Sequence, residues 1–207
     1  GGGGDDTLEG GEGDDLLIGG AGADSIDGGA GNDRLILNGG DDVATGGSGS
    51  DMFIVGPEAG AVTITDLDAG DLLERIDLTA FEAVTSLADL TIADEARGGT
   101  AGVRVTAEGV DLWLSGGSAA QIDGDSFLLS GQDPLIFRVD PSDGMDRLQA
   151  LINDAPPGAT ILLAAGTYVV TETLLIARSD ITLTGAGEGL TVFRTEIPDS
   201  AAAPTIL

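Results

Sequence analysis

Cysteine, lysine and histidine are all absent from this chain of 207 residues. Without cysteine, neither disulfide bonds nor thiolate metal sites are available. Without lysine and histidine, general acid–base catalysis has almost no candidates apart from Tyr168 and a few arginines such as Arg178 and Arg194. Aromatic residues make up only 3% of the chain, too few for an evident sugar-stacking platform. We therefore expect no catalytic set and no organic cofactor site in this chain.

Long apolar runs are also missing. No stretch of about 18 apolar residues is present, so we expect no membrane span. The first residues do not show a basic region followed by an apolar stretch, so no cleavable signal is visible. The chain starts inside a repeat and ends on an apolar run, which suggests a piece of a longer parent protein.

The charge of the chain is strongly one-sided. Acidic residues number 36 and basic residues 8, which gives a formal net charge of −28. Self-repulsion of this size opposes a compact fold unless cations neutralise it, and it makes nucleic acid and anionic membranes poor partners. Divalent cations are the natural partners, and carboxylate oxygens suit calcium best.

A repeat of nine residues fills the first 54 positions. The blocks are GGGGDDTLE, GGEGDDLLI, GGAGADSID, GGAGNDRLI, LNGGDDVAT and GGSGSDMFI. Five of the six match GGxGxDxUx, where U is a large apolar residue. The fifth block, 37–45, lacks the first glycine pair and has Ala44 at the apolar position.

Each block combines a tight turn with a short strand. Glycine adopts left-handed backbone angles at little cost, so the first six positions favour turns. The remaining three form a strand whose apolar residue points into a thin core. The core residues expected in this way are Leu8, Leu17, Ile26, Leu35 and Phe53. Two blocks would make one turn of a flattened coil, with turns about 4.8 Å apart.

Stacking of alternate blocks brings repeated carboxylates together. Asp6 is expected near Asp24, and Asp15 near Asp33. Two bare carboxylates about 5 Å apart repel by about 1 kcal/mol in water and more in a lower dielectric. A calcium ion between them reverses the sign, and glycine carbonyls in the turns can supply further oxygens. Without the ion, we expect a disordered glycine- and aspartate-rich segment.

This repeat resembles the hemolysin-type calcium-binding repeats of RTX proteins. The resemblance implies a parallel β-roll with roughly four to six calcium ions, in a protein secreted to the extracellular space, through a bacterial type I pathway. In that family one loop contributes its second and fourth carbonyls and its aspartate, and the loop above contributes its first and third carbonyls and its aspartate. The implied ligand sets are Gly2, Gly4 and Asp6 with Gly19, Ala21 and Asp24; Gly11, Gly13 and Asp15 with Gly28, Ala30 and Asp33; Gly20, Gly22 and Asp24 with Leu37, Gly39 and Asp42; and Gly29, Gly31 and Asp33 with Gly46, Ser48 and Asp51.

The middle segment, 55–133, is expected to be a β-rich cap on the roll. Strands are expected at 62–64, 76–78, 103–105, 110–114 and 127–129, with a short helix at 86–90. The stretch I-T-D-x-D-x-G-D at 64–71 resembles the segment that follows RTX repeats. Asp66, with Asp68 and Asp71, either completes a further calcium site with Gly47, Gly49 and Asp51 or forms an exposed turn. Trp113 and Phe127 are expected to be core residues.

The tail, 134–207, is expected to begin a second solenoid. A helix capped by Ser142 or Asp143 would carry Met145, Leu148 and Ile152 on one face. Strands are expected at 160–163, 168–170, 174–176, 181–183 and 191–193. The stretch DRLQALINDAPPGATILLAAGTY resembles the N-terminal cap and first rungs of the right-handed parallel β-helices of pectate-lyase-like enzymes and mannuronan C5-epimerases.

Together these patterns predict an all-β chain in three parts. A calcium-binding parallel β-roll (1–54) precedes a β-rich cap (55–133) and the start of a right-handed parallel β-helix (134–207). The leading functional interpretation is a calcium-binding structural module that folds after secretion and stabilises or spaces neighbouring domains of its parent. Two alternatives remain, a fragment of a polysaccharide-modifying enzyme of the alginate epimerase or lyase type, and an adhesin or carbohydrate-binding module with extracellular polysaccharide as partner.

Overall fold

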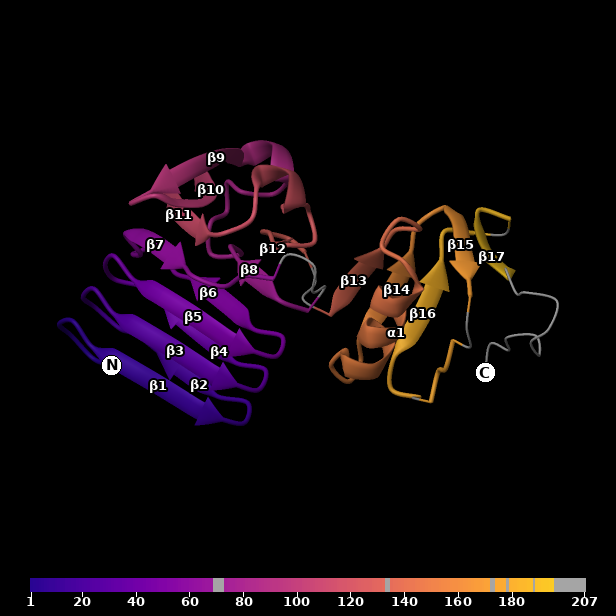
Figure 1. Cartoon of the computed structure of the whole chain (residues 1–207), viewed down its shortest axis with the longest axis horizontal. Coiled ribbons are helices and arrows are strands. Elements are labelled where there is room, and N and C mark those ends of the chain that lie inside the picture. Colours follow the sequence, from indigo (N-terminus) through magenta and orange to yellow (C-terminus); the bar gives the residue numbers. More distant parts are fainter. Residues whose placement is uncertain (69–72, 133–134, 172–173, 178, 188, 196–207) are drawn as a thin grey trace. The chain divides into compact units, whose positions relative to one another are not determined.

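The computed structural model describes the chain except for residues 69–72, 133–134, 172–173, 178, 188 and 196–207. The chain forms two units, Gly1–Gln132 and Asp133–Leu207 (Figure 1). Short β-strands dominate both units, and most of them pair in parallel. No described helix has the length and apolarity needed to cross a membrane.

The first unit begins as a flattened coil of stacked strands in two parallel sheets (Figure 1). Strands and loops repeat with a period of two blocks, because Leu8 pairs with Ile26 and Leu17 with Leu35. Each pair of nonapeptides is therefore one turn of the coil. One sheet contains β1 (Thr7–Glu12), β3 (Ser25–Ala30), β5 (Val43–Ser48) and β7 (Ala61–Ile64), and the other contains β2 (Leu16–Ile18), β4 (Arg34–Leu37), β6 (Met52–Val55) and β8 (Arg75–Asp77).

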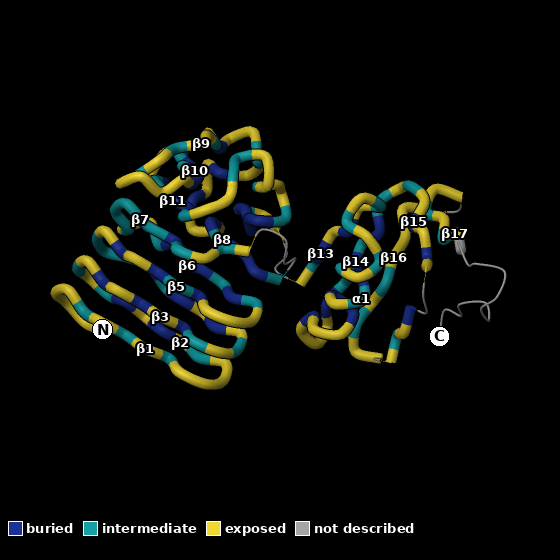
Figure 2. The backbone as a smooth tube through the Cα atoms, viewed as in Figure 1, coloured by how far each residue is buried: buried dark blue, intermediate teal, exposed yellow. Residues whose placement is uncertain are grey.

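The core of the coil is a narrow strip between the two sheets. Ile26, Leu35 and Phe53 are almost completely buried, as the repeat predicts. Because successive side chains of a strand point to opposite faces, their neighbours face solvent, and Figure 2 shows this alternation along the coil. Ala44, at the apolar position of the fifth block, is fully buried as well.

The coil continues beyond the last nonapeptide. β7 pairs with β5, with Ala44 opposite Ile64, and β8 pairs with β6, with Phe53 opposite Ile76. Ile64 and Ile76 are fully buried. Stacking therefore depends on the alternation of apolar and polar residues along the strands. A turn that lacks the glycine repeat can still extend the coil.

An antiparallel group of strands covers the end of the coil. β11 (Val110–Ser115) pairs in parallel with β7, and β10 (Thr100–Ala107) and β9 (Thr91–Arg97) follow it antiparallel. β12 (Phe127–Leu128) pairs with β8, and two short 3₁₀ helices, η1 (Leu87–Asp89) and η2 (Ala119–Gln121), connect the strands. The five strands expected between residues 55 and 133 are confirmed, whereas β9 was not predicted.

Phe127 and Trp113 are both buried, but in different places. Phe127 belongs to the core of the first unit. Trp113 alternates with the core residues Leu112 and Leu114, so it lies on the opposite face of the sheet, where the guanidinium carbon of Arg97 is 5.5 Å from its ring. The prediction is therefore confirmed for Phe127, and Trp113 is buried as predicted but lies outside the main apolar cluster, with a cation–π contact from Arg97 on its ring.

The second unit also stacks parallel strands. β13 (Ile136–Val139), β14 (Thr160–Leu163) and β16 (Thr182–Gly185) form one sheet, and β15 (Gly166–Val170) pairs with β17 (Thr191–Thr195). The helix α1 (Met145–Asp154) buries Leu148, Leu151 and Ile152. The whole chain is thus mostly β, and its first unit is a β-solenoid.

Two local predictions in the second unit are wrong. No strand forms at 174–176, because the side-chain amide of Gln149 on α1 bonds both main-chain groups of Leu175, at 2.7 and 2.9 Å. The residue at the N-cap of α1 is Gly144, with a φ of 85°, and neither Ser142 nor Asp143 takes that place. The carboxylate of Asp143 instead accepts bonds from Asp140 N, at 2.6 Å, and from Arg147.

Candidate metal centre

The glycine-rich halves of the blocks stack along two edges of the coil. Loops 1–6, 19–24 and 37–42 form what we call the first edge, and loops 10–15, 28–33 and 46–51 form the second edge. This arrangement follows from a turn of two blocks, since alternate blocks must lie above one another. The predicted metal ligands of each set are therefore brought to one edge.

The repeated aspartates form a hydrogen-bonded ladder along each edge. On the first edge, Asp6 N donates to Oδ1 of Asp24 at 2.8 Å, and Asp24 N donates to Oδ1 of Asp42 at 2.9 Å. On the second edge, Asp15 N donates to Oδ1 of Asp33 at 2.7 Å, and Asp33 N to Oδ1 of Asp51 at 2.8 Å. Each carboxylate thus reaches down to the main chain of the turn below.

The second oxygen of these carboxylates is buried and lacks a protein donor. Asp24, Asp33 and Asp42 are at most 2% exposed. Their Oδ2 atoms, and Oδ2 of Asp15, make no hydrogen bond to the described part of the chain. Burial of a charged oxygen without a partner is costly, so the arrangement fits a bound cation at each Oδ2.

Main-chain carbonyls converge on the same points. A Cβ placed on Gly10 would lie 2.8 Å from Oδ2 of Asp15 and also in contact with the carbonyl oxygen of Gly28. A Cβ on Gly28 would likewise contact Oδ2 of Asp33 and the carbonyl oxygen of Gly46. These oxygen pairs are the ones that the ligand sets predict, and only glycine leaves the space between them open.

Carboxylates alone do not complete any centre. Within the described residues, no group of three or more acidic side chains converges as a metal-binding cluster. Calcium takes about 6–8 oxygens, so main-chain oxygens must supply most of them. This is the kind of site that a glycine-rich turn can build, because its carbonyls are not shielded by side chains.

Several predicted carbonyls also hold the loops together. Ala21 O accepts a bond from Gly4 N at 2.6 Å, and Gly2 O accepts one from Ala21 N at 3.0 Å. A carbonyl oxygen has two lone pairs, so such a bond leaves one for an ion. The same bond is made by Ala30, Gly39 and Ser48, which accept from Gly13, Gly22 and Gly31 at 2.7, 2.6 and 2.9 Å. The remaining predicted ligands Gly11, Gly19, Gly20 and Gly29 lie in these stacked loops.

The fifth block builds a different loop. Leu37 ends β4 with a fully buried side chain, and its carbonyl accepts a bond from Gly56 N at 2.8 Å. Burial raises the pKa of Asp42 above its ordinary value, and the charges of Asp24 and Asp41 raise it further, against the lowering effect of the bond from Asp24 N. A cation beside the carboxylate of Asp42 would offset this cost of burial and charge repulsion.

Asp66 lies directly above the second edge. Its two carboxylate oxygens accept bonds from Gly46 N at 2.9 Å and Gly47 N at 2.8 Å. It therefore ties the loop of the sixth block to the next turn, close to the predicted partners Gly47 and Gly49. Asp68 N donates to Oε1 of Glu74 at 2.8 Å, and Asp71 lies outside the described residues.

A second ladder was not foreseen from the sequence. The residue just before the repeated aspartate also bonds along the stack, with Oδ1 accepting from the main-chain N–H one turn above. The four bonds are Asp5 with Ala23 (2.9 Å), Asp14 with Asn32 (2.8 Å), Asn32 with Ser50 (2.8 Å) and Asp41 with Ala61 (2.9 Å). The signal was Asp or Asn at this position in four of the six blocks.

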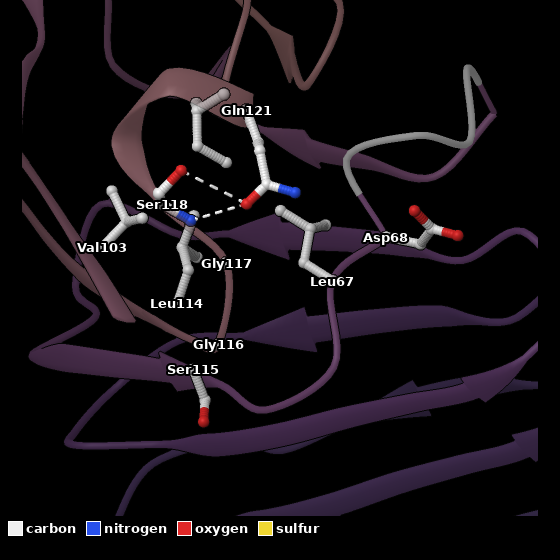
Figure 3. A pocket seen from close by; sticks show the side chains of 10 residues that line it. Leu67, Asp68, Val103, Leu114, Ser115, Gly116, Gly117, Ser118 and Gln121 are labelled. Atoms are coloured by element: carbon white, nitrogen blue, oxygen red, sulfur yellow. Dashed lines mark hydrogen bonds between the residues drawn. The ribbon is translucent and has the colours of Figure 1, made fainter. Parts of the chain in front are cut away.

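A cavity of about 400 Å³ lies in the cap of the first unit (Figure 3). Leu67, Val103 and Leu114 supply much of its wall, and Oε1 of Gln121 accepts bonds from the main chain and hydroxyl of Ser118. Among the described residues of the lining, Asp68 is the only charged one. The described lining thus mixes apolar side chains with polar groups and has little charge, unlike the carboxylate-rich edges of the coil.

Comparisons with known proteins found a matching family profile and similar solved structures. The family profile of the RTX calcium-binding nonapeptide repeat matches residues 1–35 and 30–56. The solution structure of the AlgE6R3 subunit of the Azotobacter vinelandii mannuronan C5-epimerase is similar at 28% identity and a TM-score of 0.53, over 64% of this chain and 82% of that chain. The AlgE6R2 subunit of the same epimerase is similar at 22% identity and a TM-score of 0.46, over 63% of this chain and 91% of that one.

The search of curated protein sequences gave no match. Residues 1–56 are RTX calcium-binding repeats, and their stacked coil is a β-roll of the kind found in the epimerase subunit.

Proposed function

We propose that these RTX repeats form a calcium-dependent structural module, which folds when it meets calcium outside the cell and then stabilises or spaces the neighbouring parts of a longer secreted protein. The observation that carries this proposal is the row of buried carboxylate oxygens along the two edges, at Asp15, Asp24, Asp33 and Asp42. Oδ2 of Asp15, Asp24 and Asp33 each has a glycine-lined space beside it, whereas Leu37 takes the place of that glycine in the loop of Asp42. The predicted loop sets would hold the ions, and calcium would supply the positive charge that the sequence lacks.

Electrostatics favours an ion-linked fold. The carboxylates of successive turns are stacked in a low-dielectric interior, where like charges repel more strongly than in water. The formal charge of −28 adds a general repulsion. A divalent ion between turns replaces this repulsion with attraction, which favours the stacked coil when the ion is bound.

The hydrophobic core alone is small. Each block of the roll contributes little more than one inward apolar side chain, such as Ile26, Leu35 or Phe53. Ordering each residue costs about 1–2 kcal/mol of backbone entropy, and glycine loses more than any other residue. Metal binding would therefore be part of the folding free energy, and the repeats would remain unfolded where calcium is scarce.

This coupling would suit secretion. An unfolded, strongly acidic chain would remain export-competent at the low calcium concentration inside a cell and would fold at the higher concentration outside. The absence of cysteine is in keeping with a fold that uses metal ions in place of disulfide cross-links.

A fragment of a polysaccharide-modifying enzyme is the second candidate. The similarity of this chain to a subunit of a mannuronan C5-epimerase favours a parent of this class. The chemistry would then belong to another part of that parent. The phenol of Tyr168, the only tyrosine, is buried and donates to Val139 O at 2.6 Å, so it is not presented to a substrate.

A calcium titration of the full chain, followed by far-ultraviolet circular dichroism, tests the proposal. In chelator, the contribution of residues 1–56 to the β-sheet spectrum should be lost, and millimolar calcium should restore it. Magnesium at the same concentration is the matched control, because its strict octahedral geometry suits the carbonyl-rich loops poorly. A spectrum that does not change across the calcium titration would refute calcium-linked folding.

A further inference from the structure

We infer that the residue preceding each repeated aspartate is a positioning residue that sets the spacing of successive loops and so holds the calcium ligands in register. The inference concerns Asp5, Asp14, Asn32 and Asp41, and it rests on the proposed function. These side chains would not touch the ion. Their contribution would be to fix the distance between two loops whose carbonyls and carboxylates must meet around one ion.

The two ladders run in opposite directions, which makes a reciprocal clamp. Oδ1 of Asp14 reaches up and accepts from Asn32 N at 2.8 Å. Oδ1 of Asp33 reaches down and accepts from Asp15 N at 2.7 Å. Two consecutive residues of each loop are therefore bonded to two consecutive residues of the other. Such a pair of bonds fixes both the separation and the register of the loops, which a single bond cannot do.

The same clamp recurs at other levels of the stack. On the first edge, Asp5 accepts from Ala23 N while Asp24 accepts from Asp6 N, at 2.9 and 2.8 Å. One turn further along the second edge, Asn32 accepts from Ser50 N while Asp51 accepts from Asp33 N, both at 2.8 Å. The geometry is thus a property of the stack and not of one loop.

Exposure separates the positioning residues from the proposed ligands. Asp5, Asp14, Asn32 and Asp41 are all exposed, whereas Asp24, Asp33 and Asp42 are buried. Asn32 makes the same bond as Asp14 without a negative charge. The acceptor oxygen is therefore the required feature at this position, whereas the ligand position requires the charged carboxylate.

One of the two hydrogen bonds of the clamp is missing at one level of the first edge. Ala23 occupies the positioning place in loop 19–24 and has no side-chain acceptor. Of the two side-chain bonds of the clamp, this loop and loop 37–42 therefore have only the one from Asp24 N to Asp42. Loop 37–42 is also the one that lacks the first glycine pair. The inference therefore identifies the site between these two loops as the weakest in the roll.

Variants at these positions distinguish the effect of the acceptor oxygen from the effect of the negative charge. Asp14→Asn removes one charge and keeps the acceptor, while the double variant Asp14→Ala/Asn32→Ala removes one charge and both acceptors. In calcium titrations of the full chain, Asp14→Asn should leave the folding midpoint unchanged. The double variant should raise it about 1.5- to 3-fold, because two hydrogen bonds of ordinary strength are shared among about four ions. Ala23→Asn should lower the midpoint by restoring the missing acceptor.

Ion counting at saturating calcium completes the test, with thermal unfolding as the check that the variants fold. The double variant should bind as many ions as the wild type and unfold at a lower temperature. Loss of an ion would show that these residues are ligands and would overturn the inference. Equal midpoint shifts for Asp14→Asn and the double variant, or an unchanged midpoint for Ala23→Asn, would overturn it too. A wild-type chain that does not respond to calcium would instead refute the proposed function.

Discussion

The main-chain N–H of Asp15 donates to Oδ1 of Asp33 at 2.7 Å, while Oδ2 of Asp33 is buried and accepts no hydrogen bond from the described residues. The two oxygens of one carboxylate therefore have different roles. Its first oxygen aligns two turns of the coil, and its second is left for an ion. This division explains why the same residue recurs every nine positions, since folding and metal binding both depend on it.

Aspartates shared by two loop sets should matter more than those at the end of the stack. Asp24 takes part in two predicted sites and is buried, whereas Asp6 takes part in one and is half-buried. Asp24→Ala should remove about two bound ions and Asp6→Ala about one, because each loses one carboxylate ligand per site. Isothermal titration calorimetry gives both counts.

Asp33→Ala is the matched variant on the second edge, and it should behave as Asp24→Ala does. If all three substitutions have the same effect on ion number and calcium midpoint, the carboxylates act independently, and bridging between successive turns is contradicted.

The glycine-lined space beside Oδ2 of Asp15, Asp24 and Asp33 can be tested without changing a carboxylate. A Cβ at Gly28 would contact Oδ2 of Asp33 and the carbonyl of Gly46, although the backbone angles there are not left-handed. Gly28→Ala should cost about 1–3 kcal/mol of calcium-loaded stability, because the methyl group fills the proposed ion space. Chemical denaturation in calcium measures this loss.

Gly3→Ala is the control for this prediction. A Cβ at Gly3 meets no atom within 4 Å, and its φ is not positive. The stability change should be within about 0.5 kcal/mol, as for most surface substitutions. Equal losses for Gly3→Ala and Gly28→Ala would show that glycine is needed for chain flexibility and not for an ion.

Much of the first unit follows directly from its sequence. The period of nine predicts the two-block turn, and the positions of Leu17, Ile26 and Phe53 in the core follow from the alternation within each short strand. The meeting of Asp6 with Asp24 and of Asp15 with Asp33 follows from the same period. These features were predictable because they depend on local geometry repeated without interruption.

Features that depend on one long-range contact could not be predicted. β9 has charged residues at Asp94, Glu95 and Arg97, and it is a strand because β10 pairs with it, not because of its own pattern. Leu175 lies in an apolar run, but Gln149 of a distant helix satisfies its main chain. In both cases the backbone conformation is set by a hydrogen-bonding partner elsewhere in the chain. The local sequence pattern contains no sign of that partner.

The second unit should respond to pH through Tyr168. Burial raises the pKa of this phenol above its ordinary value near 10, and the charges of Asp140 and Asp143 add to the shift. The neutral phenol is therefore favoured in the folded state, so its stabilising contribution is complete below about pH 10 and is lost as the pH rises through the higher folded value. Thermal unfolding of the second unit between pH 8 and 11 would show this decline.

Tyr168→Phe is the matched variant. It removes the bond from the phenol to Val139 O, but this carbonyl keeps its bond from Ala164 N at 2.9 Å. The loss at neutral pH should be about 1 kcal/mol, as for one hydrogen bond. The alkaline decline should become shallower in the variant, and an identical pH profile would contradict the assignment to Tyr168.

Removal of calcium should affect the two units differently. The ladders of buried carboxylates belong to the first unit, whereas the second buries its own apolar residues on α1 and its parallel strands. In hydrogen exchange, chelator should strip protection from the amides of β4 and β5 but leave that of β14 and α1 in place. Simultaneous loss in both units would contradict a local role for the ion.

A crystal structure of the full chain grown in calcium, with anomalous scattering to identify the ions, tests the central claim most directly. The account predicts an ion on each edge in contact with Oδ2 of a repeated aspartate and with a carbonyl oxygen of the next turn, as between Asp15 and Gly28. A refined structure in which these carboxylates lie between the turns, or turn towards solvent, with no metal beside them would contradict it.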